Sequence, residues 1–339
     1  MTDGKPRIIV SRTDRVGDVV LTLPVFSTLR KVLPEAHLIG HVRSYTAPLL
    51  DGHPHVDELL VDDPDGRPLA FLDLVRRIRA LRPDAAVLVH PSGRAIAACW
   101  LARVPVTAGR ASNIWQFLLT HRIVQHRSRN ERHEAAYNLE LLSPLGIAAD
   151  QHTFPSIYIN DNAKSWAVTR LASTGISASP VFVHPGHGGS ADNLPLERYV
   201  ELVSLLTAEG LPVVITLGPA ERHLEAAFGP DRTGRAAVIT DAPDIAHLAG
   251  LLSLGRGFAG GSTGPMHLAA ALGLPTVAFF PRRASMTPFR WGPLGLRTHV
   301  LMPPEEAGEA PDAMAKLDIG VAVGILGGRH PAAPVELAG

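Results

Sequence analysis

The stretch RGFAGGSTGPMHLAAALGL, residues 256–274, leads from a short apolar strand through a glycine-containing loop into a helix. A second stretch near the amino terminus, SRTDRVGDVVLTLP at residues 11–24, follows the same order. A strand that enters a helix through glycines leaves several backbone N–H groups unpaired at the positive end of the helix dipole, where an anion can bind. We therefore expect the later stretch to hold a nucleotide diphosphate and the earlier one to present the carboxylate of Asp18 to a reaction.

Outward from these stretches, the chain alternates short apolar runs, typical of buried strands, with amphipathic runs, typical of helices. We predict strands at 7–11, 37–42, 58–62, 85–90, 181–184, 212–217, 237–239, 257–259 and 275–280, and helices that include 18–32, 70–81, 94–102, 196–209 and 265–272. Strands separated by helices indicate a parallel, doubly wound sheet. Right-handed crossovers gather the strand carboxyl ends along one edge, where a site is expected.

The alternation weakens between Gly146 and Ser179, where the chain carries the polar run NDNAKS, and then restarts. A length of 339 residues accommodates two domains, each with its own core. We therefore predict an α/β protein of two doubly wound domains, residues 1–160 and 161–339, whose reactive edges face a cleft. The final helix, near 313–326, belongs to the second domain or packs back on the first.

Composition limits the class of protein further. Hydrophobic residues make up 46% of the chain and charged residues 19%, as in a globular protein and unlike a disordered one. The single cysteine, Cys99, lies in an apolar run, which excludes an internal disulfide and favours a buried thiol. The amino terminus is too polar for a signal peptide, and no apolar run has the length of a membrane span. We expect a soluble, cytoplasmic protein.

The charge is balanced overall but unevenly distributed. Between Arg67 and Arg132 there are twelve arginines and three acidic residues. Such a cluster either holds an acidic partner or forms the solvated faces of helices. Both interpretations remain open at this point.

Two glycine patterns suggest other chemistry. The run from Gly255 to Gly260 fits G-x-G-x-x-G, but it enters a strand, whereas a dinucleotide-binding fingerprint leaves one. The run GGSTG at 260–264 fits the nucleophile elbow of a serine hydrolase and lies between a strand and a helix, as an elbow must. A hydrolase would then need a downstream acid and a histidine, for which the candidates are Asp312 or Asp318 with His299 or His330.

The third interpretation of this loop is a phosphate cradle. Ser262, Thr263 and Gly264 open a helix, with Pro265 suited to its first turn. Hydroxyl and backbone N–H groups there would bind a diphosphate without a metal, and His267 either donates to the same phosphates or packs in the core. Neither H-E-x-x-H nor paired cysteines occur among the sixteen histidines and one cysteine, so no protein metal site is expected.

Asp18 also has two interpretations. From its spacing it fits the N-cap of the helix that contains VVLTLP. A carboxylate at a helix terminus beside a bound hydroxyl can also accept a proton. The two roles are compatible.

Four ordered motifs resemble glycosyltransferase family 9, the ADP-heptose:lipopolysaccharide heptosyltransferases. They are TDRVGDVVLTLP (13–24), FVHPGHGGSADNLPLERY (182–199), ITLGPAERH (215–223) and GGSTGPMHLAAALGLPTVAFF (260–280). The resemblance extends from about Arg7 to Gly292. It implies the GT-B architecture of two Rossmann-like domains, with the acceptor on the first domain, the ADP-sugar on the second, inversion at the anomeric carbon, and no metal or other cofactor.

The same resemblance assigns site residues. Asp18 matches the catalytic base, and Glu221 matches the acid that binds the ribose hydroxyls. The donor-binding residues that it implies are Gly186, Gly188, Gly189, Ser190, Glu221, Asp241, Ala242, Ser262, Thr263, Gly264 and His267. Arg12, Arg15 and Arg94 are the candidates for binding an anionic acceptor.

Two departures from the family pattern affect the donor. The family often has a lysine before Trp-Pro, whereas this chain reads Asp192-Asn-Leu-Pro195, and many members have Asp-Thr-Gly where this chain has Ser262-Thr-Gly264. An aspartate in place of a phosphate-binding lysine should weaken binding of the usual donor unless an arginine substitutes.

The predicted activity is therefore transfer of a sugar, a heptose, from an ADP-sugar to an acceptor hydroxyl. The predicted partners are the nucleotide-sugar and an anionic glycan, glycolipid or small-molecule glycoside, with contact to the inner membrane face and no nucleic acid. Two alternatives are a serine hydrolase and a GT-B protein without transfer, either a nucleotide-sugar epimerase or a binding protein.

Overall fold

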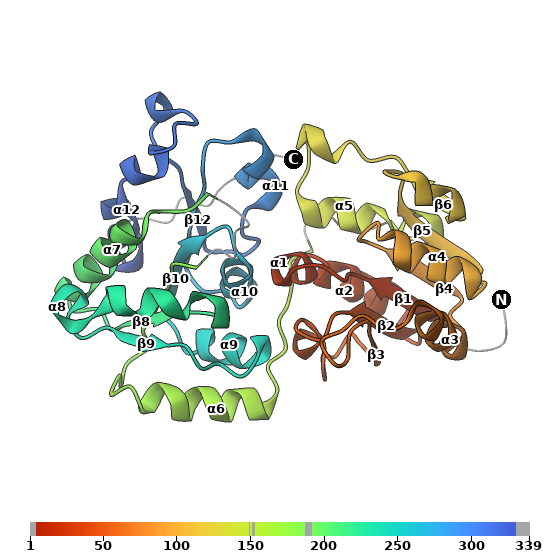
Figure 1. Ribbon diagram of the computed structural model, residues 1–339, viewed down its shortest axis with the longest axis horizontal. Coiled ribbons are helices and arrows are strands. Elements are labelled where there is room, and N and C mark those ends of the chain that lie inside the picture. Colours follow the sequence, from red (N-terminus) through yellow and green to blue (C-terminus); the bar gives the residue numbers. More distant parts are fainter. Residues whose placement is uncertain (1–4, 149, 151–152, 187–191, 330–339) are drawn as a thin grey trace. The chain divides into compact units, whose positions relative to one another are not determined.

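The computed structural model describes residues 5–148, 150, 153–186 and 192–329 (Figure 1). The chain divides into two compact units, Met1–Tyr158 and Ile159–Gly339. The sequence places the boundary after residue 160. Each unit is built on its own sheet.

The first unit is a six-stranded parallel sheet in the order β3-β2-β1-β4-β5-β6. Its strands are β1 (Arg7–Ser11), β2 (His37–Val42), β3 (Glu58–Val61), β4 (Ala85–Leu88), β5 (Val106–Arg110) and β6 (His121–Ile123). Its helices are α1 (Val16–Val20), α2 (Leu23–Val32), α3 (Phe71–Leu81), α4 (Gly93–Leu101) and α5 (Glu134–Glu140), with 3₁₀ turns η1 (Ala47–Leu49), η2 (Ile114–Leu118), η3 (Arg127–Arg129) and η4 (Ser143–Leu145). The strand order reverses between β1 and β4, so the loops that follow these two strands flank the switch point where open α/β sheets bind ligands.

The second unit repeats this plan in the order β12-β11-β10-β7-β8-β9. Its strands are β7 (Val181–His184), β8 (Val213–Thr216), β9 (Ala237–Ile239), β10 (Gly257–Gly261), β11 (Thr276–Phe279) and β12 (Thr298–Leu301). Its helices are α6 (Asp161–Ala172), α7 (Leu196–Ala208), α8 (Pro230–Thr233), α9 (Ile245–Leu252), α10 (Gly264–Ala271), α11 (Pro288–Trp291) and α12 (Ile319–Leu326), with 3₁₀ turns η5 (Pro219–Phe228), η6 (Ala284–Met286), η7 (Glu305–Ala307) and η8 (Ala313–Lys316). Here the order reverses between β7 and β10.

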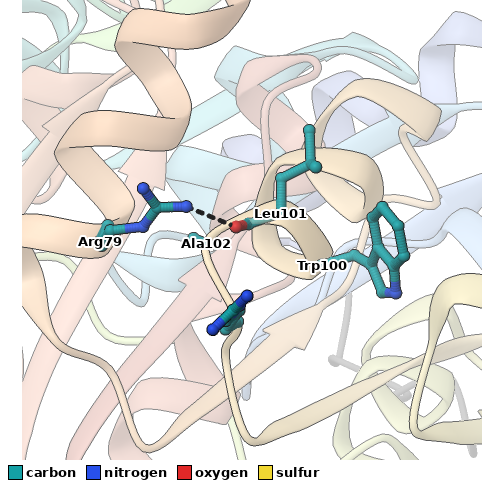
Figure 2. Close-up of a pocket in the computed structure, with 5 residues that line it drawn as sticks. Arg79, Trp100, Leu101 and Ala102 are labelled. Atoms are coloured by element: carbon teal, nitrogen blue, oxygen red, sulfur yellow. Dashed lines mark hydrogen bonds between the residues drawn. The ribbon is translucent and has the colours of Figure 1, made fainter.

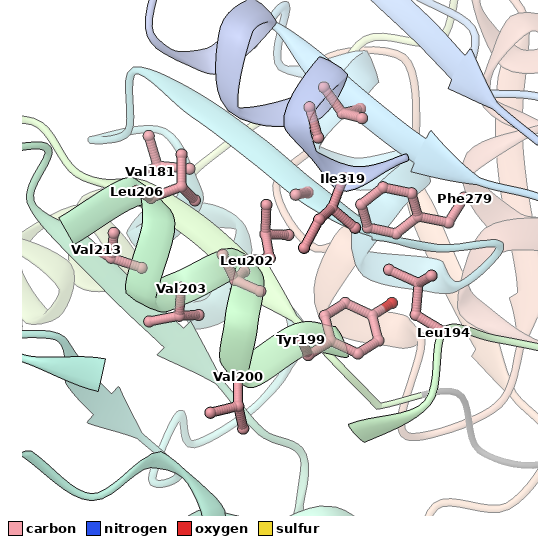
Figure 3. Close-up of a cluster of buried hydrophobic side chains, with 14 of the residues drawn as sticks. Val181, Leu194, Tyr199, Val200, Leu202, Val203, Leu206, Val213, Phe279 and Ile319 are labelled. Atoms are coloured by element: carbon pink, nitrogen blue, oxygen red, sulfur yellow. The ribbon is translucent and has the colours of Figure 1, made fainter. Parts of the chain in front are cut away.

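The core of the second unit lies between α7, α12 and the sheet (Figure 3). Tyr199 of α7 meets Phe279 of β11 edge to face, with ring centroids 5.9 Å apart. Ile319 at the start of α12 belongs to the same buried cluster, as do Val323 and Leu326. Burying each such side chain contributes about 1.5–3 kcal/mol. The final helix is therefore seated in the core of its own unit.

Several predicted elements differ from those observed. The single helix expected over 18–32 is two helices, because Pro24 has no N–H to donate to the carbonyl of Val20. The strands β5, β6 and β12 were not predicted, since they are short and lie at or next to sheet edges. Helix α6 was also missed, because its buried stripe consists mainly of Ala163 and Ala167, which give a weak apolar period.

In the part of the chain that the structure describes, no helix combines the length and apolar character needed to cross a membrane.

Candidate active site

Asp18 lies in the first turn of α1, after the carboxyl end of β1. The N-cap of α1 is Arg15, so the expectation that Asp18 caps the helix is wrong. The Asp18 carboxylate instead accepts a hydrogen bond from Nη2 of Arg12, while its backbone carbonyl accepts one from Oγ1 of Thr22 at 2.8 Å. The carboxylate is therefore held by a side chain of the preceding loop.

Arg12 is the centre of this arrangement. It is buried, directly after β1, and its Nε donates to Oδ1 of Asp14 at 2.7 Å. Its Nη1 lies 3.5 Å from Oε1 of Glu134 and 3.5 Å from Oδ1 of Asn138, both on α5. One guanidinium thus contacts three carboxylates, those of Asp14, Asp18 and Glu134.

A second buried arginine completes the network. Arg127 donates from Nη1 to Glu134 and from Nε to Oε1 of Gln125 at 2.9 Å. Its guanidinium also lies 5.3 Å from the ring centroid of Tyr137. Asn138 donates from Nδ2 to the carbonyl of Leu21 at 3.0 Å, which ties α5 to the end of α1. The two arginines face three carboxylates, so the network carries one negative charge in excess when all are ionised.

The pKa values of Asp14 and Asp18 shift in opposite directions in this network. Burial raises the pKa of Asp18, and the nearby charges of Asp14 and Glu134 raise it further against the opposing charge of Arg12. Burial also acts to raise the pKa of Asp14, but the hydrogen bond from His90, 3.1 Å away, and the charge of Arg12 hold that pKa below its usual value. Asp14 therefore stays ionised while Asp18 is suited to accept a proton.

The three arginines predicted for the acceptor are in different situations. The Arg12 guanidinium already contacts the carboxylates of Asp14, Asp18 and Glu134. Arg94 on α4 donates to the carbonyl of Leu69 at 2.5 Å and to Oδ1 of Asp62 at 3.3 Å. Arg15 is exposed at the start of α1, and its side chain forms no hydrogen bond or ion pair with the described residues. Of the three, Arg15 is the side chain best able to meet a ligand without breaking an existing contact.

In the second unit, the loop from β10 into α10 has the predicted form. Thr263 is the N-cap of α10, and Pro265 lies in its first turn. His267, in the same turn, is buried. A Cβ at Gly261 would lie 2.4 Å from Oδ1 of Asn193, so this position requires glycine. Nδ2 of Asn193 also donates to the carbonyl of Pro185 at 3.0 Å, a bond within the loop after β7 that holds Asn193 against Gly261 at the end of β10.

Glu221 and Gly186 are in direct contact. A Cβ at Gly186 would lie 1.9 Å from Oε1 of Glu221, so the absence of a side chain makes room for this carboxylate. Oε2 of Glu221 accepts from the backbone N–H of Gly218 at 2.8 Å and lies 3.5 Å from Nε2 of His184. Burial lowers the pKa of His184, against the charge of Glu221, so the imidazole is neutral near pH 7. The carboxylate is fixed while remaining partly exposed.

The other predicted donor residues lie further along the same edge or outside the described residues. Asp241 follows β9, the edge strand, and accepts from Nε of Arg170 through both oxygens, at 2.9 and 3.0 Å. Ala242 beside it is half-buried. Gly188, Gly189 and Ser190 lie outside the described residues. The described donor candidates therefore follow β7, β8, β9 and β10 at one edge of one sheet.

The chain resembles known proteins in sequence and in fold. Residues 73–316 match the sequence profile of glycosyltransferase family 9 (heptosyltransferase). The chain belongs to glycosyltransferase family 9. It is 32% identical over 301 residues to a Haemophilus influenzae protein named "Putative glycosyltransferase", covering 85% of this chain and 86% of that protein.

Two further relatives of this family 9 enzyme come from Escherichia coli. Lipopolysaccharide heptosyltransferase 3 of strain K12 is 26% identical over 281 residues, covering 78% of this chain and 79% of that protein. The solved structure of ADP-heptose lipopolysaccharide heptosyltransferase II is 20% identical and has a TM-score of 0.79, covering 96% of this chain and 98% of that one. The fold is therefore GT-B, and the enzyme is a glycosyltransferase.

Membership of family 9 contradicts the hydrolase alternative, and the geometry excludes His299, one of its two candidate histidines. His299 lies opposite Val277, which lies opposite Ala259, so His299 is two strands across the sheet from β10. With a strand spacing of about 4.8 Å and a rise of about 3.3 Å per residue, the Cα atoms of His299 and Ser262 are about 14 Å apart, too far for a hydrogen bond. The candidate acids have other partners: Asp312 pairs with Lys316 at 3.1 Å, and Asp318 caps α12. His330 lies outside the described residues.

A large cavity of the family 9 enzyme lies away from the Asp18 site. A cavity of about 950 Å³ is lined by Arg79, Trp100, Leu101, Ala102 and Arg103 (Figure 2). Arg79 donates from Nη2 to the carbonyl of Leu101 at 2.7 Å, which joins the carboxyl ends of α3 and α4. Helices end at the sheet edge opposite the strand carboxyl ends, so this cavity is separate from the Asp18 site.

Apart from Arg12, which was expected to bind the acceptor, the residues that surround Asp18 were not predicted from the sequence. Glu134 and Asn138 are spaced i, i+4 in the run EAAYNLELL at 134–142, where Glu140 is the only other residue that is not apolar, and this spacing is the one signal that the sequence carried. Arg127 lies within the arginine cluster, where nothing distinguishes it from its exposed neighbours. Only the tertiary contacts identify Arg12 and Arg127 as buried partners of carboxylates.

Proposed function

We propose that this family 9 enzyme transfers a heptose from an ADP-sugar to an acceptor hydroxyl with inversion. Asp18 takes the proton of the hydroxyl as its oxygen attacks the anomeric carbon, and the bond from that carbon to the diphosphate breaks, so that ADP leaves. The observation that carries this proposal is a buried carboxylate, held by Arg12, whose pKa is raised by its surroundings.

The donor assignment rests on the second unit. The amino end of α10, with Thr263 and Gly264, supplies backbone N–H groups suited to the charge that develops on the leaving diphosphate. Glu221, fixed against Gly186, is suited to accept from ribose hydroxyls. Because the backbone N–H groups at the start of α10 stabilise the charge of the diphosphate, our proposal needs no metal. The name of the E. coli ADP-heptose lipopolysaccharide heptosyltransferase II supports ADP-heptose as the donor.

The acceptor is proposed to be an anionic glycan, as in a lipopolysaccharide core, which the name of the E. coli heptosyltransferase 3 supports. A glycolipid acceptor would place the enzyme at the cytoplasmic face of the inner membrane. Exposed apolar side chains in the first unit support that contact: Ile114, Phe117 and Val124 are 72%, 66% and 68% exposed. The guanidinium of Arg122 lies 5.7 Å from the Phe117 ring and adds the charge that anionic lipids attract.

The membrane contact has its own test. The double substitution Ile114→Ser with Phe117→Ser should reduce co-sedimentation with vesicles that contain anionic phospholipid. Leu296→Ser is a matched control, because Leu296 is 79% exposed on the second unit. Equal loss in both variants, or no binding by the native protein, would contradict the contact.

The activity is tested by incubating the enzyme with ADP-heptose and following ADP release with and without an acceptor glycan, in the presence of EDTA. Acceptor-dependent release that disappears in Asp18→Asn supports the proposal. Release that does not depend on acceptor, or conversion of the sugar without release of ADP, would favour an epimerase or another non-transferring protein. A requirement for added divalent metal would contradict the metal-independent part.

A further inference from the structure

The cavity at the carboxyl ends of α3 and α4, which we call the α3–α4 cavity, has basic and aromatic walls (Figure 2). Its volume is about 950 Å³, and Arg79, Trp100 and Arg103 are among the residues that line it. Trp100 is 54% exposed, an unusual position for so large an apolar side chain. Pockets that bind small molecules have volumes of about 300–1,000 Å³ and a few polar groups on apolar walls. The α3–α4 cavity has both features.

The guanidinium of Arg103 is not needed to cap α4. A cation at the end of a helix often pairs with the last four carbonyls, which have no partner within the helix. In α4 all four have other partners. Three accept from backbone N–H groups of the following turn at 2.9 to 3.1 Å, namely the carbonyls of Ala98, Cys99 and Trp100. The fourth, that of Leu101, accepts from Arg79 at 2.7 Å. The Arg103 side chain forms no hydrogen bond or ion pair with the described residues.

The surroundings of the cavity carry excess positive charge. Residues 76–103 include six arginines and one acidic residue, Asp84, whose carboxylate accepts from the backbone N–H of Arg7 at 2.8 Å. Neither Arg79 nor Arg103 forms an ion pair with a carboxylate in the described chain. Two guanidiniums on the wall of one cavity repel each other, so an anion that contacts both lowers their energy.

The aromatic wall is separate from the guanidinium of Arg79. In Figure 2 the indole of Trp100 and this guanidinium lie on opposite sides of Leu101. An exposed indole stacks on flat rings such as nucleobases, whereas a guanidinium pairs with phosphate oxygens through parallel N–H groups. A molecule that joins a flat ring to phosphates meets both walls. A bilayer also attracts tryptophan and arginine, but its surface would not fill a hollow of this size.

We propose that the α3–α4 cavity is a nucleotide-binding site, in which Arg79 and Arg103 contact the phosphates and the base stacks on Trp100. The cavity lies at the sheet edge opposite the Asp18 site, so a nucleotide bound here takes no part in the chemistry at Asp18. The inference goes beyond the proposed function and is independent of it, because it uses none of the residues assigned to sugar transfer.

Photo-crosslinking with 2-azido-ADP, followed by mass spectrometry of the peptides, localises the site. The native protein should be labelled on the peptide that contains Trp100. ADP should prevent this labelling at about 10-fold lower concentration than pyrophosphate or adenosine, because each of those makes only one of the two contacts.

Two variants test the walls of the cavity. Arg103→Asn should raise the probe concentration for half-maximal labelling about 10-fold, and asparagine tolerates the φ of 61° at this position. Trp100→Leu, which stays apolar but has no ring to stack, should have a similar effect. The matched control is Arg82→Asn, because Arg82 is also an exposed arginine with a positive φ, of 47°, and does not line the cavity.

The remaining outcomes overturn the inference. They are the absence of label on this peptide, equal labelling of the native protein and Arg103→Asn, and competition by pyrophosphate as strong as that by ADP. Displacement of the probe by phosphatidylglycerol vesicles but not by ADP would assign the arginines to a membrane surface and overturn it as well. Label on peptides of the second unit reports the proposed donor site separately, so failure of one site is distinguished from failure of the other. Unchanged thermal midpoints confirm that the variants fold.

Discussion

The guanidinium of Arg12 and the carboxylate of Asp18 form an ion pair with 5% and 17% of the two side chains exposed. The same guanidinium contacts Asp14 and lies near Glu134. A carboxylate that is buried, held in place and surrounded by excess negative charge has a fixed position and an enhanced affinity for a proton. These are the two properties that a general base requires.

The first prediction concerns catalysis. Asp18→Asn keeps the size and most hydrogen bonds of the side chain but cannot accept the acceptor proton, so kcat should fall about 10²–10⁴-fold while ADP affinity stays within about twofold. Steady-state kinetics and calorimetry measure the two effects. Asp73→Asn, at an exposed ion pair with Arg76 in the same unit, is the matched control and should retain full activity. Turnover by Asp18→Asn near the native level would refute the role.

The second prediction is the pH dependence of kcat/KM. The base must be ionised, so kcat/KM should rise with pH through the pKa of Asp18, which burial and the neighbouring acids place above the ordinary carboxyl range. Glu134→Gln removes one of those negative charges and should move this limb to lower pH. If the rise of kcat/KM in Glu134→Gln stays at the same pH or moves to higher pH, Glu134 does not raise the pKa of Asp18.

The third prediction separates the two aspartates by stability. A carboxyl with a raised folded pKa gives stability that is present below its unfolded pKa and lost as pH rises through the folded pKa. Asp18→Asn should therefore be at least as stable as the native protein at pH 7. Asp14 has the opposite shift, so its contribution is present above the unfolded pKa and is lost as pH falls, and Asp14→Asn should lower the thermal midpoint at pH 7. Thermal melts at pH 4 and 7 test both signs.

The fourth prediction concerns Arg12 itself. Arg12→Met leaves Asp14, Asp18 and Glu134 buried without their shared cation, which should cost about 3–5 kcal/mol in the free energy of unfolding. Denaturant titration measures the loss. Arg15→Met, an exposed arginine three residues away, should change the free energy by less than about 0.5 kcal/mol. Equal effects of the two substitutions would disprove the central position of Arg12.

The fifth prediction uses a matched pair of glycines. In Gly186→Ala the new Cβ displaces the Glu221 carboxylate, so ADP should bind about 10-fold or more weakly. Gly229→Ala is the control, because a Cβ there meets no atom within 4 Å and its φ of −66° is open to alanine. Calorimetry on both variants distinguishes loss of the Glu221 contact from a general effect of substitution, which would weaken binding equally.

Part of this site follows from the sequence. The glycine loop before α10 and the buried strand β10 were predictable because a short apolar run, glycines and Pro265 each restrict the local backbone. The position of the loops at one edge of the sheet can also be predicted, since parallel strands with right-handed crossovers align their carboxyl ends. The N-cap assignment of Asp18 failed because one turn of helix can begin at any of several residues, and spacing does not distinguish Val16 from a later start.

The partners of Asp18 could not be predicted in this way. Glu134 is more than a hundred residues from Asp18, and its contact with Arg12 depends on how α5 docks against the end of α1. The pairing of Asp192 with Arg283 likewise joins loops that follow different strands. The parallel α/β architecture, the glycine loops and the candidate base could be predicted from the amino-acid sequence, because local backbone preference and apolar periodicity act over a few residues. The charge around that base and the contact of Asp192 with Arg283 emerge on folding, because Coulomb interactions and burial depend on distances in space between residues far apart in the chain.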